Sequence, residues 1–300
     1  MTGRGAEKTM WRSKLTIPTA FVLLWSTGWI VAHYAAIDAG VLTFLLFRYA
    51  GAAFLLTVYA LVSGATWPRS AHAWGHALAS GVLIHALYLG GIWWAVAHGV
   101  PASISALLAA LQPLLTAILA PHLAGERIGP VQWAGISLGL VGLILVLGPK
   151  LANVDPVELD TITLLLVINA CGMVALTLGT FYQKRYLRTG DLGSMAALQF
   201  IGAFVVTLPF AFWLEGMRID FTWNTWLSLA WSIGALSIVS IALLLHLIRK
   251  GEVARSAQLI YLVPPAAAIQ AFLLFGETLS PVQIAGMMVT TLGVALAVRR

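Results

Sequence analysis

Long apolar runs alternate with short polar connections along the chain. Most of the connections contain Gly, Pro, Asn or Asp, which end helices and form turns. An α-helix needs about 20 apolar residues to cross a hydrocarbon core of roughly 30 Å. The pattern therefore predicts an all-α integral membrane protein with ten transmembrane helices. The predicted spans cover residues 16–36, 41–62, 74–97, 102–120, 131–147, 161–182, 194–213, 224–247, 256–275 and 282–298.

The composition supports this interpretation. Of the 300 residues, 60% are hydrophobic and only 9% are Asp, Glu, Lys or Arg, whereas a soluble domain carries about a quarter charged residues. The only cysteine, Cys171, excludes an intramolecular disulfide framework and a cysteine metal cluster. Its position in an apolar run favours a small buried hydrophobic side chain.

The basic residues predict the orientation, because the cytoplasmic side of a membrane protein accumulates Lys and Arg. With the N-terminus inside, fourteen of the 17 basic residues lie in inner segments, Lys150 and Arg218 lie outside, and Arg48 lies within a span. Both termini are therefore predicted to be cytoplasmic. The net charge of +6 then reflects topology, and no nucleic-acid partner is expected.

Two segments of the chain repeat each other. Residues 125–135 (GERIGPVQWAG) and 276–286 (GETLSPVQIAG) agree at seven positions. Their spacing predicts two five-helix halves, residues 1–150 and 151–300. Five is odd, so equivalent helices cross in opposite directions, with Glu126 inside and Glu277 outside, as in the inverted repeats of many secondary transporters. A structural role in a helix-turn-helix connection explains the motif itself. Pro lies in the first turn of the second helix, and Glu, just ahead of that turn, faces the positive end of the helix.

Several features together resemble a known family. The ten spans, the two Gly-Glu-x-x-x-Pro hairpins, Phe47-Arg48-Tyr49 and the tryptophan in the first helix resemble the drug/metabolite transporter superfamily, specifically its EamA-like exporters. Among these the chain looks most similar to the YddG-type aromatic amino-acid exporters of bacterial inner membranes. Trp25-Ser26 departs from the Trp-Gly common in the family, which affects the expected local packing and leaves the expected fold unchanged.

Motifs for other chemistry are missing from the sequence. It contains no Gly-x-x-x-x-Gly-Lys phosphate loop and no His-Glu-x-x-His, and every Asp and Glu falls between the predicted spans. We therefore expect no enzyme activity, no cofactor and no metal site. A desolvated organic cation needs a buried negative partner, so a cation-selective exporter is disfavoured. His33 and His85 are the only mid-span groups that titrate near neutral pH, so either one of them couples protons or transport follows the substrate gradient.

Deep aromatic and polar residues predict the substrate site. Trp25, Trp29 and His33 recur at i, i+4 and i+8, and His85 and Tyr88 at i, i+3. Polar groups within spans usually face the protein interior or a wet cavity, so these faces could line an aromatic chamber, with interhelical packing as the alternative for each residue. The predicted substrate-binding residues are Trp25, Trp29, His33, His85, Tyr88, Trp231, Gln258 and Tyr261.

A second group is predicted to be structural or gating: Arg48, Pro113, Glu126, Pro264, Pro265 and Glu277. Arg48 either snorkels to the outer boundary, which is the favoured interpretation, or forms a structural hydrogen-bond hub, or pairs with a substrate carboxylate. The prolines break two helices at related depths, as hinges or as static bends. Small residues in the fifth and tenth helices predict close packing away from the pore.

These observations predict a bacterial inner-membrane secondary transporter. It would export aromatic amino acids (Trp, Phe, Tyr) and related neutral metabolites by alternating access, with the lipid bilayer and a small-molecule substrate as its partners. The alternative within the superfamily is a broad drug/metabolite exporter. From other classes, a membrane enzyme or a nontransporting scaffold is disfavoured by the absent catalytic motifs and by the deep polar faces.

Overall fold

The computed structural model describes residues 3–109, 112–124, 129–152, 156–187, 190–240, 243, 263–276 and 278–297. Over these residues the regular structure is helical, apart from an isolated bridge between Ala39 and Ile219. The α-helices are α1 (Gly3–Asp38), α2 (Val41–Val62), α3 (Ala71–Gly81), α4 (Tyr88–Ala97), α5 (Ala102–Ala109), α6 (Gln112–Ala124), α7 (Pro130–Ala152), α8 (Pro156–Tyr186), α9 (Leu192–Glu215), α10 (Trp223–Trp231), α13 (Val263–Phe275) and α14 (Pro281–Ala297), and the π-helices are η1 (Val82–Leu87) and η2 (Ser232–Val239).

Helices occupy the predicted spans wherever these are described. Within the described parts of the chain, five helical segments are long and apolar enough to cross a membrane: α1 from Thr19, α2, the continuous run α3–η1–α4, α8 from Ile162, and α9. Among the described residues, shorter apolar helices lie in four of the remaining spans, 102–120, 131–147, 256–275 and 282–298, and α10 and η2 lie in the span 224–247. Three helices run well beyond the predictions, since α1 begins at Gly3, α7 ends at Ala152 and α8 begins at Pro156. Glu158 and Asp160 therefore lie within the first turns of α8, where the sequence predicted a connection.

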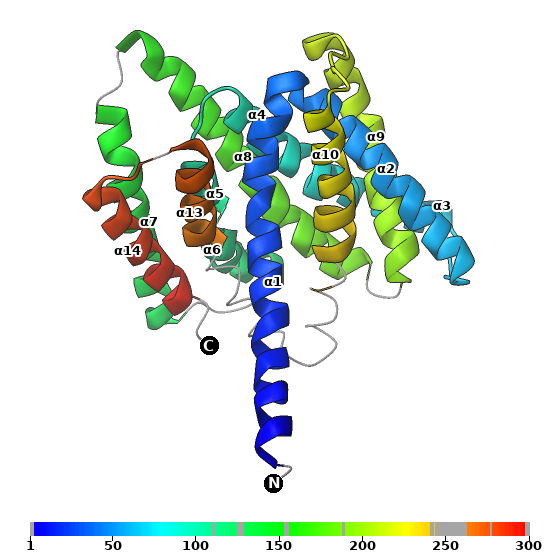
Figure 1. Cartoon of the computed structure of the whole chain (residues 1–300), viewed down its shortest axis with the longest axis horizontal. Helices are drawn as coiled ribbons and strands as arrows, with labels where there is room; N and C mark the ends of the chain where they lie inside the picture. Colours follow the sequence, from blue (N-terminus) through cyan, green and yellow to red (C-terminus); the bar gives the residue numbers. More distant parts are fainter. Residues whose placement is uncertain are drawn as a thin grey trace.

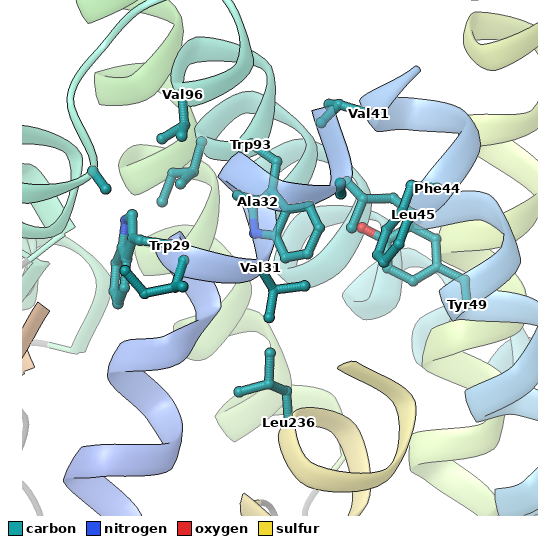
Figure 2. Packing of buried hydrophobic residues seen from close by; sticks show 14 of the residues in the cluster. Trp29, Val31, Ala32, Val41, Phe44, Leu45, Tyr49, Trp93, Val96 and Leu236 are labelled. Carbon is teal, nitrogen blue, oxygen red and sulfur yellow. The ribbon is translucent and has the colours of Figure 1, made fainter. Parts of the chain in front are cut away.

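In Figure 1, α1 lies between two groups of helices. On one side of it α2, α3 and α9 lie together, and on the other side α7 lies against α14, with α5, α6 and α13 between that pair and α1. The main hydrophobic core joins α1, α2, α4 and η2. Figure 2 shows Trp29 and Val31 of α1, Tyr49 of α2, Trp93 of α4 and Leu236 of η2 in this core.

Glycines bring α7 and α14 into close contact, as the small-residue pattern predicts. A Cβ atom on Gly142 would lie 2.7 Å from the carbonyl oxygen of Gly286, and one on Gly286 would lie 2.8 Å from that of Gly142. A Cβ atom on Gly135 or on Gly293 would likewise clash with backbone atoms of the facing helix. Cys171 differs from its prediction, because its side chain is exposed on α8 rather than buried.

The two π-helices occupy matching positions relative to the two repeated segments of the sequence. In the register that aligns residues 125–135 with 276–286, residues 82–87 of η1 correspond to 233–238, inside η2. π-Helical turns are rare and are often found at functional sites. Both segments contribute to the wall of the same cavity, described below.

Polar contacts join the α1–α2 turn to the α9–α10 connection. The Glu215 carboxylate accepts hydrogen bonds from the backbone N–H groups of Leu42 and Thr43 at 2.9 and 2.8 Å, so it caps α2 from a distant part of the chain. The Asp38 carboxylate accepts hydrogen bonds from Thr222 at 2.6 Å and Asn224 at 2.9 Å. These contacts fasten α1 and α2 to the second half at one end of the molecule.

A candidate substrate cavity

A cavity of about 330 Å³ lies between α1, α2, α4, α6, α8, α9 and the two π-helices. Its volume is within the range typical of small-molecule pockets. The cavity is lined by Phe21, Trp25, Gly28, Trp29, Arg48, Ile84, His85, Tyr88, Leu89, Ile92, Trp93, Gln112, Leu176, Thr180, Gln183, Phe200, Leu236 and Ser237. Four of the predicted substrate-binding residues belong to this lining: Trp25, Trp29, His85 and Tyr88.

Two tryptophans of α1 form one wall. The Trp25 ring lies 5.3 Å from the ring of Phe21, one turn earlier on the helix. The Trp29 side chain is 5% exposed, and its Nε1–H donates to Ser105 Oγ at 3.2 Å. Ser105 Oγ also accepts a hydrogen bond from Asn169 Nδ2 at 2.6 Å. This chain of hydrogen bonds fixes the Trp29 ring against α5 and α8.

His85 and its neighbours form another wall, on η1. The His85 ring stacks on Phe200 of α9, with ring centres 4.3 Å apart and planes at 16°. Its backbone carbonyl accepts a hydrogen bond from the Tyr49 hydroxyl at 2.8 Å. Tyr49 is fully buried and follows Arg48 directly, so α2 supports η1 at the point where both reach the cavity.

Arg48 points into the protein, so the favoured prediction that it snorkels to the membrane boundary is wrong. Its side chain is 7% exposed and lines the cavity. The Nε–H donates to Ser237 Oγ on η2 at 3.1 Å, and the guanidinium carbon lies 5.4 Å from the centre of the Trp93 ring. Arg48 thus connects α2, α4 and η2. It is the only charged residue in the described lining.

Two predicted residues lie outside the cavity lining. The exposed His33 ring stacks obliquely on Phe275 of α13, with centres 4.0 Å apart. Trp231 is 42% exposed and its Nε1–H donates to Thr27 Oγ1 at 2.9 Å, which ties α10 to α1. The interhelical packing alternative therefore describes both of them.

Several other predictions fall on parts of the chain that are not described. Gln258, Tyr261, Glu126 and Glu277 lie outside the described residues. Pro113 belongs to α6, and Pro264 and Pro265 belong to the first turn of α13, while the part of the ninth span before Val263 is not described. The roles of these residues as hinges stay predictions.

Sequence reasoning missed part of the lining. Gln112 and Gln183 are amides in or beside apolar segments, and this signal could have found them. Thr180, Phe200 and Ser237 are not singled out by the sequence, because the span that contains each of them holds several residues of the same type. Ser26, the departure from the family pattern, is fully buried, and its Oγ accepts from Gln270 Nε2 of α13 at 2.9 Å.

A larger groove of about 770 Å³ lies between α13 and α14. Its lining is mainly apolar and includes Ile269, Phe272, Leu279, Met288 and Leu292. None of the predicted substrate-binding residues lies there. Such a surface on short apolar helices suits lipid acyl chains, so we place the candidate site in the smaller central cavity.

Apolar helices of membrane-spanning length around a cavity with several aromatic residues in its lining are features of a multi-pass membrane transporter. Residues 17–148 and 162–299 each match the EamA-like transporter family, and the chain belongs to that family. It is therefore a multi-pass membrane protein from a family of transporters rather than enzymes.

The relatives come from plants and bacteria. The chain is 26% identical over 298 residues to the WAT1-related protein At3g02690, chloroplastic, of Arabidopsis thaliana, covering 97% of this chain and 70% of that protein. It is 27% identical over 221 residues to a probable amino-acid metabolite efflux pump of Salmonella typhimurium, covering 69% of this chain and 71% of that protein. It is also 27% identical over 282 residues to the uncharacterized inner membrane transporter YedA of Escherichia coli, covering 92% of this chain and 88% of that protein.

A solved crystal structure has the same fold. It superposes with a TM-score of 0.60 at 20% sequence identity, covering 94% of this chain and 95% of the other. At this identity the likeness concerns the fold alone.

Proposed function

We propose that this chain exports aromatic amino acids and related neutral metabolites across a bacterial inner membrane by alternating access. The aromatic cavity is the observation that carries this proposal. Trp25, Trp29, Tyr88, Trp93 and Phe200 supply flat apolar surfaces to one cavity. Aromatic rings pack favourably against one another in offset or edge-to-face arrangements, so this wall suits an aromatic side chain.

The polar groups of the cavity suit an amino-acid head group. Gln112, Thr180 and Gln183 bring amide and hydroxyl groups to a lining that is otherwise mainly apolar. No Asp or Glu belongs to the described lining, which disfavours an unaccompanied organic cation as substrate. The Salmonella relative is named as a probable amino-acid metabolite efflux pump, which agrees with this substrate class.

Alternating access is supported by the symmetry of the chain. Two family matches, residues 17–148 and 162–299, divide it close to the predicted halves, 1–150 and 151–300. η1 and η2 occupy matching positions in the two halves and both reach the cavity. If the halves have opposite orientations, rocking one against the other gives two states of similar energy that open to opposite sides.

The test is transport by the purified protein in proteoliposomes. Labelled Trp, Phe and Tyr should each cross the membrane faster than in protein-free liposomes, and each should compete with the other two. Competition by a panel of hydrophobic toxins measures the breadth of the substrate range. Robust flux of another metabolite with no flux of the three aromatic amino acids would overturn the substrate assignment and leave the transporter family intact.

A further inference from the structure

The central cavity contains a cation that has no counterion among the described residues. A guanidinium group offers five N–H donors. The Arg48 guanidinium makes one hydrogen bond within the described part of the chain, from Nε–H to Ser237 Oγ at 3.1 Å. Its two terminal nitrogens therefore have no acceptor there, although the side chain is only 7% exposed.

None of the described Asp and Glu residues lines the cavity, and three of them are engaged elsewhere. Asp38 accepts hydrogen bonds from Thr222 and Asn224, and Glu215 caps the N-terminus of α2. Asp191 caps the N-terminus of α9 through Gly193 N–H at 2.8 Å. These three groups lie at helix ends, and none of them lines the cavity.

A buried charge without a partner is costly, whereas an arginine and a carboxylate form two parallel, charge-assisted hydrogen bonds. From this geometry we propose that Arg48 binds the carboxylate of the transported molecule. The inference rests on the proposed function in one respect, namely that the central cavity is the substrate site. It adds the chemical feature that every good ligand must have, a carboxylate group.

The neighbours of Arg48 hold its side chain for this role. Ser237 of η2 binds Nε, and the Trp93 ring of α4 lies beside the guanidinium, which leaves the terminal nitrogens as the donors available to a ligand. Arginine stacks on aromatic rings while it presents its planar fork to a carboxylate, a combination that lysine cannot reproduce.

The depth of Arg48 predicts how a substrate lies. α1 and α2 are joined by the short turn at residues 39–40, so residues at equal distances from the turn lie at similar depths. At 1.5 Å per residue, Arg48 lies roughly 10 Å and Trp29 roughly 13 Å from the ends of their helices at this turn. A carboxylate at Arg48 therefore lies near the level of Trp29 and leaves the space toward Trp25 and Phe21 for the apolar part of the substrate.

Three indole compounds separate the carboxylate from the rest of the ligand. L-Tryptophan carries a carboxylate and an ammonium group, indole-3-propionate carries only the carboxylate, and tryptamine carries only the ammonium group. Binding to wild-type protein in nanodiscs is measured from the ligand-dependent rise in unfolding temperature. We expect the two carboxylates to stabilise the protein and tryptamine to bind at least about tenfold more weakly, since charge-assisted pairs contribute about that much.

The variant Arg48→Gln should bind L-tryptophan and indole-3-propionate at least about tenfold more weakly than the wild type. Its affinity for tryptamine should be unchanged or higher. Arg48→Lys keeps the charge without the planar fork, so its affinity for the two carboxylates should lie between those of the wild type and Arg48→Gln. Arg185→Gln is the matched control, because Arg185 lies beside Tyr186, 5.3 Å from its ring, outside the cavity lining. Its ligand preference should equal that of the wild type.

Two results would overturn the proposal. The first is equal binding of tryptamine and indole-3-propionate to the wild type, a comparison that needs no variant and is independent of how well Arg48→Gln folds. The second is unchanged carboxylate affinity in Arg48→Gln.

A second set, L-leucine, 4-methylpentanoate and 3-methylbutylamine, separates this inference from the proposed function. Carboxylate preference in the leucine set without binding of the indole set would reject aromatic substrates and support Arg48 as the carboxylate site. Failure of every carboxylate in both sets to bind would reject the role of Arg48.

Discussion

The direction of each side chain on α1 decides which of its residues reach the cavity. A helix has 3.6 residues per turn, so a residue at i+4 is displaced by about 40° around the axis and one at i+8 by about 80°. Trp25 and Trp29 accordingly share the cavity wall, whereas His33 lies against Phe275. The spacing in the sequence was sufficient to predict the first two and misleading for the third.

Truncation of cavity residues should lower transport without unfolding the protein. Trp25→Ala and Tyr88→Ala each remove an aromatic surface from the lining, and the loss of about 0.5–1.5 kcal/mol of aromatic contact corresponds to a roughly twofold to tenfold lower flux of labelled Trp. Trp231→Ala is the matched control because Trp231 lies outside the lining. Normal flux in both cavity variants, with folding verified by size-exclusion chromatography, would place the substrate elsewhere.

At the scale of helices, hydropathy predicts where a span lies and says little about its internal geometry. The predicted span 41–62 coincides with α2. The π-helices were not predicted, because an i→i+5 hydrogen-bond pattern has no hydrophobic period of its own and depends on packing in the folded protein. The capping of α2 by Glu215 was missed for a similar reason, since the two partners lie far apart in the sequence.

Glycine substitutions in α7 should have opposite effects on stability. Gly142→Ala places a methyl group against the backbone of α14, and overpacking of this kind costs about 1–3 kcal/mol. Gly148→Ala on the same helix meets nothing within 4 Å and should stabilise the helix by about 0.5–1 kcal/mol. Unfolding temperatures of the two variants in detergent test the difference. Equal temperatures would mean that α7 and α14 are not in close contact.

At the scale of the whole molecule, contacts between the two halves determine the site. Arg48 belongs to the first half and Ser237 to the second, and Trp29 is linked through Ser105 to Asn169 of the second half. The sequence predicted the halves and several of their cavity residues. It could not pair residues across the halves, because each pair depends on how the helices are arranged in three dimensions.

The orientation of the halves gives a prediction for the intact cell. In a Cys171→Ala background, Ser63→Cys lies in a connection predicted to be cytoplasmic and Arg218→Cys in one predicted to face outward, and both side chains are exposed. A membrane-impermeant maleimide should therefore label Arg218→Cys in whole cells and Ser63→Cys only after the membrane is opened. The unsubstituted Cys171→Ala protein is the unlabelled control. Labelling of Ser63→Cys but not Arg218→Cys in whole cells would mean that the protein has the opposite orientation. Labelling of both positions from outside would contradict an odd number of spans between them.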